Sequence, residues 1–189
     1  MLTYSLNEFL ADCSTIAASH CDPADSVLAV APLMERLLEG DRSFLRPEHL
    51  RSDPAHYARN AIYIAPDERL SLFALVWLPG HWTPVHDHGS WGVVGVLQGT
   101  LEERNFIAID GEISTDSGIR LKRGGVILLK ERSISSFVPN PDHIHVTGVP
   151  AAREMAVTLH LYGRNMDSFH IYDVEAGTRQ LVDVQHQGT

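Results

Sequence analysis

The segment GHWTPVHDH ends in two histidines, His86 and His88, separated by a single residue. In a β-strand, residues i and i+2 point to the same face, so an extended backbone brings these two imidazoles side by side. Paired imidazoles are a natural clamp for a transition metal. The alternative is two exposed histidines in a loop. A third histidine, His145, opens a later strand-like segment, and an antiparallel barrel can return it beside the first pair.

A neighbouring histidine competes for the third position. His143 shares a face with His145 if that segment is extended, so spacing alone leaves both residues open as ligands. For four other histidines we expect a surface or hydrogen-bonded place without metal. These are His56, His81, His170 and His186.

Charge and composition exclude several classes of protein. The chain has 189 residues and a net charge of −9, with 15 Lys and Arg against 24 Asp and Glu. Such a balance, without a basic run, argues against binding to nucleic acid or to an anionic membrane. No apolar stretch reaches the roughly 18 residues of a membrane span, and the N-terminus lacks the basic region of a signal peptide. We therefore expect a cytoplasmic protein, a monomer or a weak homo-oligomer, with Cys13 and Cys21 reduced.

Apolar periodicity separates a helical start from a β-rich remainder. Spacings of three and four predict helices over 5–20 and 25–39, with a third short helix near 47–52. From about residue 57 the period falls to two, and short apolar runs alternate with turn residues. The predicted strands cover 58–64, 69–78, 91–97, 100–107, 125–130, 133–138, 144–149 and 155–162.

These elements predict a mainly β chain with one domain. Short, closely spaced strands without intervening helices favour an antiparallel sandwich or barrel. Residues 1–56 would form an N-terminal helical cap and residues 57–172 the barrel with the metal site. Residues 173–189 would form a C-terminal extension, a strand followed by a loose end.

The glycines around the paired histidines sharpen the fold prediction. Gly80, Gly92 and Gly99 have the spacing of the first motif of the cupin superfamily, and only the acidic residue of that motif is missing. The segment PNPDHIHVTGV resembles the second motif, with Asp142 where a glycine is usual. The resemblance implies a double-stranded β-helix (jelly-roll) barrel that holds a metal inside.

Within the cupins, two longer segments resemble the thiol dioxygenase family, which includes cysteine dioxygenase and 3-mercaptopropionate dioxygenase. They are TPVHDHGSWGVVGVLQG and HVTGVPAAREMAVTLHLYG. The resemblance implies that His86, His88 and His145 bind Fe(II). It also implies that the protein uses O2 to oxidise a small thiol carboxylate, L-cysteine first, to its sulfinic acid.

Further site residues carry over from the same resemblance. Tyr162 matches the active-site tyrosine, His160 the histidine that hydrogen-bonds it, and Thr158 stands where the family has serine. Strand alternation independently places these three residues on one face. That face lines the cavity, unless it is a polar outer face of the barrel. The segment YARN resembles that of cysteine dioxygenases, so Arg59, aided by Tyr57, is expected to hold the substrate carboxylate.

Two departures leave the substrate open. Gly92 stands near the place where animal cysteine dioxygenases have a crosslinking cysteine, so no Cys–Tyr thioether is expected. The segment GSWG resembles the mercaptopropionate type, which keeps 3-mercaptopropionate and mercaptosuccinate as alternative substrates. Alternatives of another class are a cupin oxygenase that cleaves carbon–carbon bonds and a non-enzymatic metal-binding cupin.

Overall fold

A computed structural model describes residues 4–19, 22–111, 113–139 and 143–184 of the chain. Two helices come first, α1 (Leu6–Ser19) and α2 (Pro23–Glu39), followed by two 3₁₀-helices, η1 (Arg42–Phe44) and η2 (Pro47–Leu50). Both α-helices have a side-chain cap at their start. In α1 the Ser5 and Glu8 side chains exchange hydrogen bonds with each other's backbone N–H, and Asp22 caps α2.

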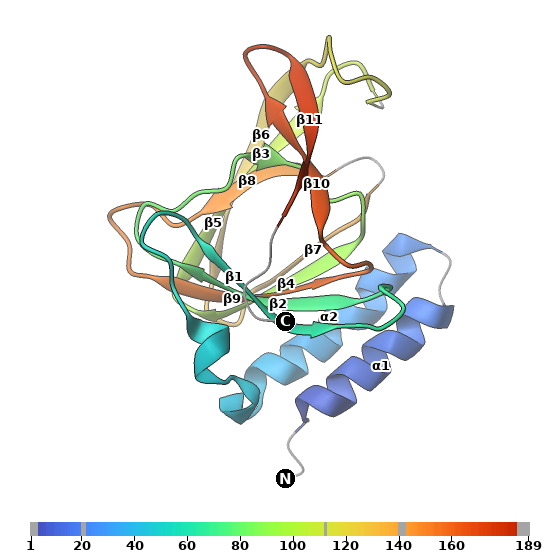
Figure 1. Ribbon diagram of the computed structural model, residues 1–189, viewed down its shortest axis with the longest axis vertical. Coiled ribbons are helices and arrows are strands. Elements are labelled where there is room, and N and C mark those ends of the chain that lie inside the picture. The colour runs from blue at the N-terminus through green and yellow to red at the C-terminus, as the bar shows by residue number, and fades with distance from the viewer. Residues whose placement is uncertain (1–3, 20–21, 112, 140–142, 185–189) are drawn as a thin grey trace.

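The rest of the chain forms two antiparallel sheets (Figure 1). One sheet has the order β1-β2-β9-β4-β7 and the other β11-β10-β3-β8-β5-β6. The strands are β1 (Ala58–Ile64), β2 (Ser71–Trp77), β3 (Val85–His86), β4 (Gly92–Gln98), β5 (Thr100–Ala108), β6 (Leu121–Lys130), β7 (Ile134–Phe137), β8 (Ile144–Gly148), β9 (Ala156–Tyr162), β10 (Ser168–Asp173) and β11 (Thr178–Asp183). The predicted mainly β jelly-roll barrel with an N-terminal helical cap is confirmed.

The two helices cover the outer face of the five-stranded sheet (Figure 1). A Cβ added at Gly95 of β4 would lie 2.9 Å from Leu38 and 3.0 Å from Met34, so glycine lets α2 approach this strand closely. The other face of the same sheet lines the barrel interior. Strands β2 and β9 are therefore buried on both faces, which gives the site a rigid wall.

Some predicted elements differ from those observed. The apolar run at 125–130 belongs to β6, an edge strand on which Val126, Ile127 and Leu128 are exposed. The sequence prediction omitted strand β10, which pairs with β3 and with β11. The predicted C-terminal strand is β11, and the predicted loose end at 185–189 lies outside the described residues.

Two smaller predictions concern the cysteines and the membrane. Cys13 is a buried free thiol, whereas Cys21 lies outside the described residues. Within the described ranges, neither helix has the length and apolar character needed to cross a membrane.

Candidate metal centre

Three buried histidines meet inside the barrel. His86 ends β3, and its direct partner on β8 is His145, while His88 follows two residues after His86. The ring centroids of His86 and His145 lie 4.6 Å apart. The His88 ring lies 4.8 Å from His86 and 5.0 Å from His145, and one ligand nitrogen from each residue fits within 4.8 Å of the others.

The environment keeps these imidazoles neutral. Burial, followed by the neighbouring histidines, holds the pKa of His86 and of His88 well below the usual value. Burial also lowers the pKa of His145. The Nδ1 of His86 donates to the Pro84 carbonyl at 3.1 Å, which leaves Nε2 with a free lone pair.

A divalent transition metal fits this set of donors. Among the described residues, neither ring nitrogen of the buried His145 has a hydrogen-bond partner, and such atoms call for a ligand. Three neutral nitrogen donors suit iron, nickel or zinc, and leave further coordination positions for other ligands.

The competing His143 lies beside the triad. Its ring centroid is 4.5 Å from that of His145, but its Nε2 bonds the Asn105 side-chain oxygen at 3.0 Å. The three-histidine group contains His145, and His143 instead joins Glu103 and His145 in a second group. This geometry favours His145 as the third ligand.

A hydrogen-bonded chain runs along the inner face of β9. The Tyr162 hydroxyl lies 3.1 Å from Nδ1 of His160, and Nε2 of His160 lies 2.8 Å from the Thr158 hydroxyl. Trp77 of β2 extends the chain, because its Nε1 donates to the Thr158 oxygen at 2.9 Å. All three predicted residues are buried in the barrel, and the polar outer face considered as an alternative is not observed.

Burial sets the protonation of this chain. It lowers the pKa of His160 to about 3, and the positive charge of Arg59 adds to this effect. It raises the pKa of Tyr162 to about 12, although Arg59 opposes the rise. At neutral pH the imidazole is therefore neutral, and the phenol keeps its proton as a hydrogen-bond donor.

Arg59 is a buried cation without an anionic partner among the described residues. Its side chain is buried in β1, with the guanidinium 4.4 Å above the Phe73 ring. Nη2 donates to the Met166 carbonyl at 3.1 Å, but within the described part of the chain Nε and Nη1 have no hydrogen-bond partner. Tyr57 stacks on Trp77 nearby, with ring centroids 4.7 Å apart. A buried guanidinium with free donors is suited to an anionic ligand.

Seven of the eight residues predicted from the sequence line one cavity, and the eighth, Thr158, is buried behind its wall, bonded to His160 and Trp77. The empty volume of this cavity, open solvent included, is about 350 Å³. The lining residues are Tyr57, Arg59, Leu75, Trp77, Thr83, His86, His88, His145, Thr147, His160, Tyr162, Met166 and Phe169. The arrangement places a three-nitrogen metal site, a cation and a phenol donor within reach of one small molecule.

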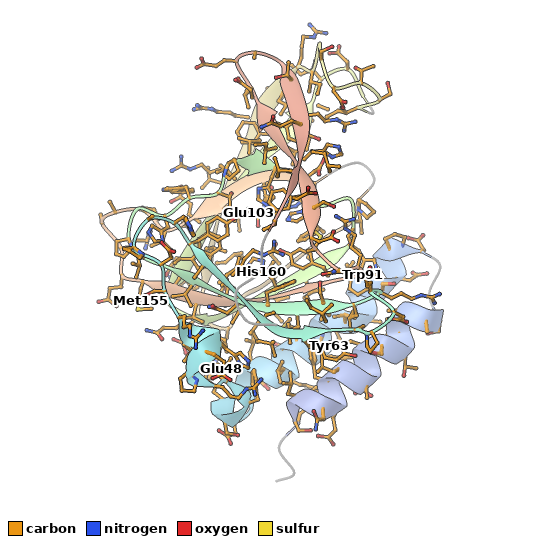
Figure 2. The ribbon with its side chains drawn as sticks, in the orientation of Figure 1. Glu48, Tyr63, Trp91, Glu103, Met155 and His160 are labelled. Carbon is orange, nitrogen blue, oxygen red and sulfur yellow. The ribbon has the colours of Figure 1, made fainter. Side chains whose placement is uncertain are left out.

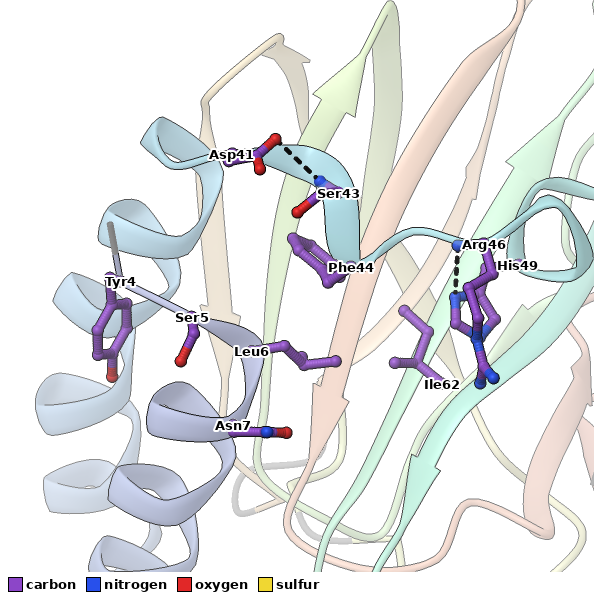
Figure 3. A pocket seen from close by; sticks show the side chains of 10 residues that line it. All are labelled: Tyr4, Ser5, Leu6, Asn7, Asp41, Ser43, Phe44, Arg46, His49 and Ile62. Carbon is purple, nitrogen blue, oxygen red and sulfur yellow. Dashed lines mark hydrogen bonds between the residues drawn. The ribbon is translucent and has the colours of Figure 1, made fainter. Parts of the chain in front are cut away.

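A second cavity, shown in Figure 3, is larger but shares none of these residues. Its empty volume is about 780 Å³, and its wall includes Tyr4 and Leu6 at the start of α1 and Ile62 of β1. The polar contacts drawn there, from Asp41 and His49 to nearby backbone N–H groups, cap the 3₁₀-helices. We therefore assign the chemistry to the smaller cavity.

Two buried carboxylates near the triad were missed by the sequence prediction. Asp87 lies between two triad histidines and accepts from the backbone N–H of His170 at 3.1 Å and from the Tyr172 hydroxyl at 2.7 Å. It thereby ties β3 to β10. Glu103 of β5 lies inside the barrel, like His160 (Figure 2), and faces His143 and His145.

The position of Gly92 supports the expected absence of a crosslink. Gly92 is the direct partner of Tyr162 in the β4–β9 pair. A Cβ at this position would lie 2.4 Å from the Phe137 ring, so the ring occupies the space that a cysteine side chain needs.

Comparisons with known proteins agree with this fold and assign the chain to a family. The model of the family described as Cysteine dioxygenase type I matches residues 26–175. The Cysteine dioxygenase type 1 proteins of Bos taurus and Homo sapiens are each 27% identical over 135 residues, 71% of this chain and 64% of theirs. The chain thus spans less than two thirds of their length. A double-stranded beta-helix domain protein from Klebsiella pneumoniae superposes with a TM-score of 0.50 and 16% identity, covering 70% of this chain and 98% of that one.

Proposed function

Since the chain belongs to the cysteine dioxygenase type I family, we propose that it is a non-haem Fe(II) thiol dioxygenase acting on a small thiol carboxylate, with L-cysteine as the first candidate. The observation that carries the proposal is the shared cavity. It joins the three-histidine site to the unpaired guanidinium of Arg59 and to the phenol of Tyr162.

The proposed reaction adds both atoms of O2 to the thiol sulfur (RSH + O2 → RSO2H) and needs no other reactant. His86, His88 and His145 would hold Fe(II), which supplies positions for the thiolate and for O2 together with redox chemistry. Three neutral imidazoles would add no negative charge of their own to the metal, and this would favour binding of the thiol as thiolate.

Arg59 binds and orients the substrate in this proposal. Its free Nε and Nη1 donors suit the two oxygens of a carboxylate, and the surrounding apolar rings strengthen that ion pair by excluding water. Tyr57, stacked on Trp77, closes the wall beside Arg59. The carboxylate held here would place the sulfur at the three-histidine site.

The β9 chain orients a hydrogen-bond donor. Trp77 already donates to the Thr158 oxygen, so the Thr158 hydroxyl can donate its proton to Nε2 of His160. Nδ1 of His160 then donates to the Tyr162 oxygen, and the phenol proton is left to point into the cavity. There it would stabilise negative charge on the reacting oxygen or sulfur.

A thiol carboxylate without an amine, such as 3-mercaptopropionate, is the second candidate substrate. None of the described residues that line the cavity is an aspartate or a glutamate, so no carboxylate is placed to bind an ammonium group. This observation keeps 3-mercaptopropionate and mercaptosuccinate in the substrate panel.

The test is O2 consumption by anaerobically Fe(II)-loaded protein in the presence of L-cysteine, 3-mercaptopropionate, mercaptosuccinate or cysteamine. We expect O2 uptake with at least one thiol carboxylate, matched by its sulfinate, and little with cysteamine, which lacks the carboxylate. The His145→Ala variant controls for free iron. Stoichiometric iron without uptake on any thiol would contradict the proposal and favour another cupin oxygenase or a binding protein.

A further inference from the structure

Glu103 occupies a place where the barrel pattern calls for an apolar side chain. On β5, Leu101 and Glu103 both point inward, while Arg104 is exposed. Glu103 is only 3% exposed, although burying a carboxylate costs several kcal/mol unless partners compensate for the lost water. A glutamate at such a position needs a specific reason.

The partners of Glu103 are two imidazoles. Its Oε1 lies 3.3 Å from Nε2 of His143, and its Oε2 lies 3.5 Å from Nδ1 of His145. Within the described part of the chain, no Lys or Arg side chain pairs with this carboxylate. The sheet register fixes this arrangement, because Glu103 pairs directly with Thr147, two residues from His145 along β8.

We propose that Glu103 is a positioning residue for the metal site, which holds His145 through its Nδ1 and so presents Nε2 to the metal. A carboxylate requires a proton on the nitrogen that faces it, which leaves the lone pair on the other nitrogen. Among the described residues neither ring nitrogen of His145 has a hydrogen-bond partner, so Glu103 acts on Nδ1 as a charge 3.5 Å away, and Nε2 is left for the metal. Carboxylate–histidine pairs of this kind fix ring orientation and raise ligand basicity in metal sites.

Charge balance supports the same assignment. The first metal motif of this chain lacks its acidic residue, and Glu103 brings a negative charge to the site from a different strand. A divalent metal and Arg59 together carry three positive charges. Glu103 offsets part of this positive charge, as does Asp87, the other buried carboxylate near the triad.

The test measures Co(II) affinity of the Glu103→Gln protein, since Co(II) is stable in air and its visible bands report coordination geometry. Glutamine has the size of glutamate but lacks its charge. We expect an apparent dissociation constant about 10- to 100-fold higher than that of the wild type, with altered visible bands. The control is Glu102→Gln, the same change at the next residue of β5, whose side chain pairs with Arg104; its affinity should stay within about twofold.

Two results would overturn the inference: Co(II) affinity of Glu103→Gln within about twofold of the wild type, or an equal loss in both variants. Should Glu103→Gln fail to fold, Glu103→Asp serves instead, because it keeps the charge but withdraws the oxygens from the histidines. The same two criteria then apply to it.

The inference rests on the proposed function only in taking the three histidines as metal ligands. Its failure is distinguishable from failure of that function. A wild-type protein that binds Co(II) through Glu103 but oxidises no thiol would leave the inference standing. If the protein oxidises a thiol but its metal affinity is the same in Glu103→Gln as in the wild type, only the inference about Glu103 fails.

Discussion

His145 of β8 is the direct cross-strand partner of His86 of β3, and their ring centroids lie 4.6 Å apart. The register of one strand pair therefore decides whether a third imidazole reaches the other two, since a slip of one residue turns a side chain to the opposite face. Strand β3 has only two residues, and Asp87 anchors the next position to β10. The metal site thus depends on contacts that lie outside the ligand set.

The choice between the two candidate third ligands is open to a direct test. We expect His145→Ala to lose stoichiometric Fe(II) binding, because it removes one of three buried nitrogens that converge. The matched variant His143→Ala should keep about one iron per chain, since His143 faces Asn105 and Glu103. Metal analysis after anaerobic loading and desalting measures both. Retention of iron by His145→Ala together with its loss in His143→Ala would reverse the assignment.

Removal of the buried cation should act on substrate binding. We expect Arg59→Ala to raise KM for a thiol carboxylate about 10- to 100-fold, the equivalent of losing charge-assisted hydrogen bonds worth ~1.5–3 kcal/mol, with a smaller effect on kcat. Arg59→Lys keeps the charge but loses the planar set of guanidinium donors, so its KM should lie between those of the wild type and Arg59→Ala. Steady-state O2 uptake measures the constants. An unchanged KM in Arg59→Ala would remove this residue from the substrate site.

The Thr158 hydroxyl links Trp77 to His160, so its removal should disturb both stability and turnover. In Thr158→Val the buried Trp77 N–H loses its acceptor, which should lower the free energy of unfolding by about 1–3 kcal/mol. The orientation of His160 is also lost, and kcat should fall with little change in KM. Thr158→Ser keeps the hydroxyl and is the control. Equal kcat in the valine and serine variants would show that the hydroxyl does not orient the chain.

The buried histidines should make the metal-free protein sensitive to acid. Burial holds the folded-state pKa of His86 and His88 well below 6.5, and that of His160 at about 3, so below pH 6.5 the unfolded chain binds more protons than the folded one. Their contribution to stability is complete above about pH 6.5 and is lost as the pH falls, by up to ~1.4 kcal/mol per pH unit for each histidine.

Urea unfolding of the metal-free protein on either side of pH 6.5 measures this loss. His160→Gln should flatten the pH dependence, because it removes one of the titrating groups without changing the triad. The Glu103 carboxyl, whose pKa His143 and His145 hold below its usual value against the effect of burial, contributes only at more acidic pH. If the urea concentration at the unfolding midpoint is the same above and below pH 6.5, the account is contradicted.

The sequence predicted the residues of the cavity better than the contacts that support them. Histidines separated by one residue, and the alternation of Thr158, His160 and Tyr162, are local patterns, so they could be interpreted from the sequence alone. Glu103 lies in the charged run LEERN, where alternation from the apolar Leu101 is the only sign that it points inward. This alternation pointed to an inward Glu103, but the charged residues around it made the pattern weak.

Asp87 shows a different limit. Its partners, His170 and Tyr172, lie on β10, and the sequence analysis did not predict a strand there. A contact across such a long stretch of chain depends on the pairing of β3 with β10, which no local pattern specifies. The same limit applies to the exposed apolar residues of β6, since their exposure follows from the edge position of that strand.

The central claim is that this cavity transfers both atoms of O2 to one thiol sulfur. The most direct measurement is mass spectrometry of the product formed by the Fe(II)-loaded protein from a thiol carboxylate under isotopically labelled O2. The account predicts a sulfinic acid that carries two labelled oxygen atoms, at a yield matching the O2 consumed. A disulfide with hydrogen peroxide, or a sulfinic acid with oxygen from water, would contradict it.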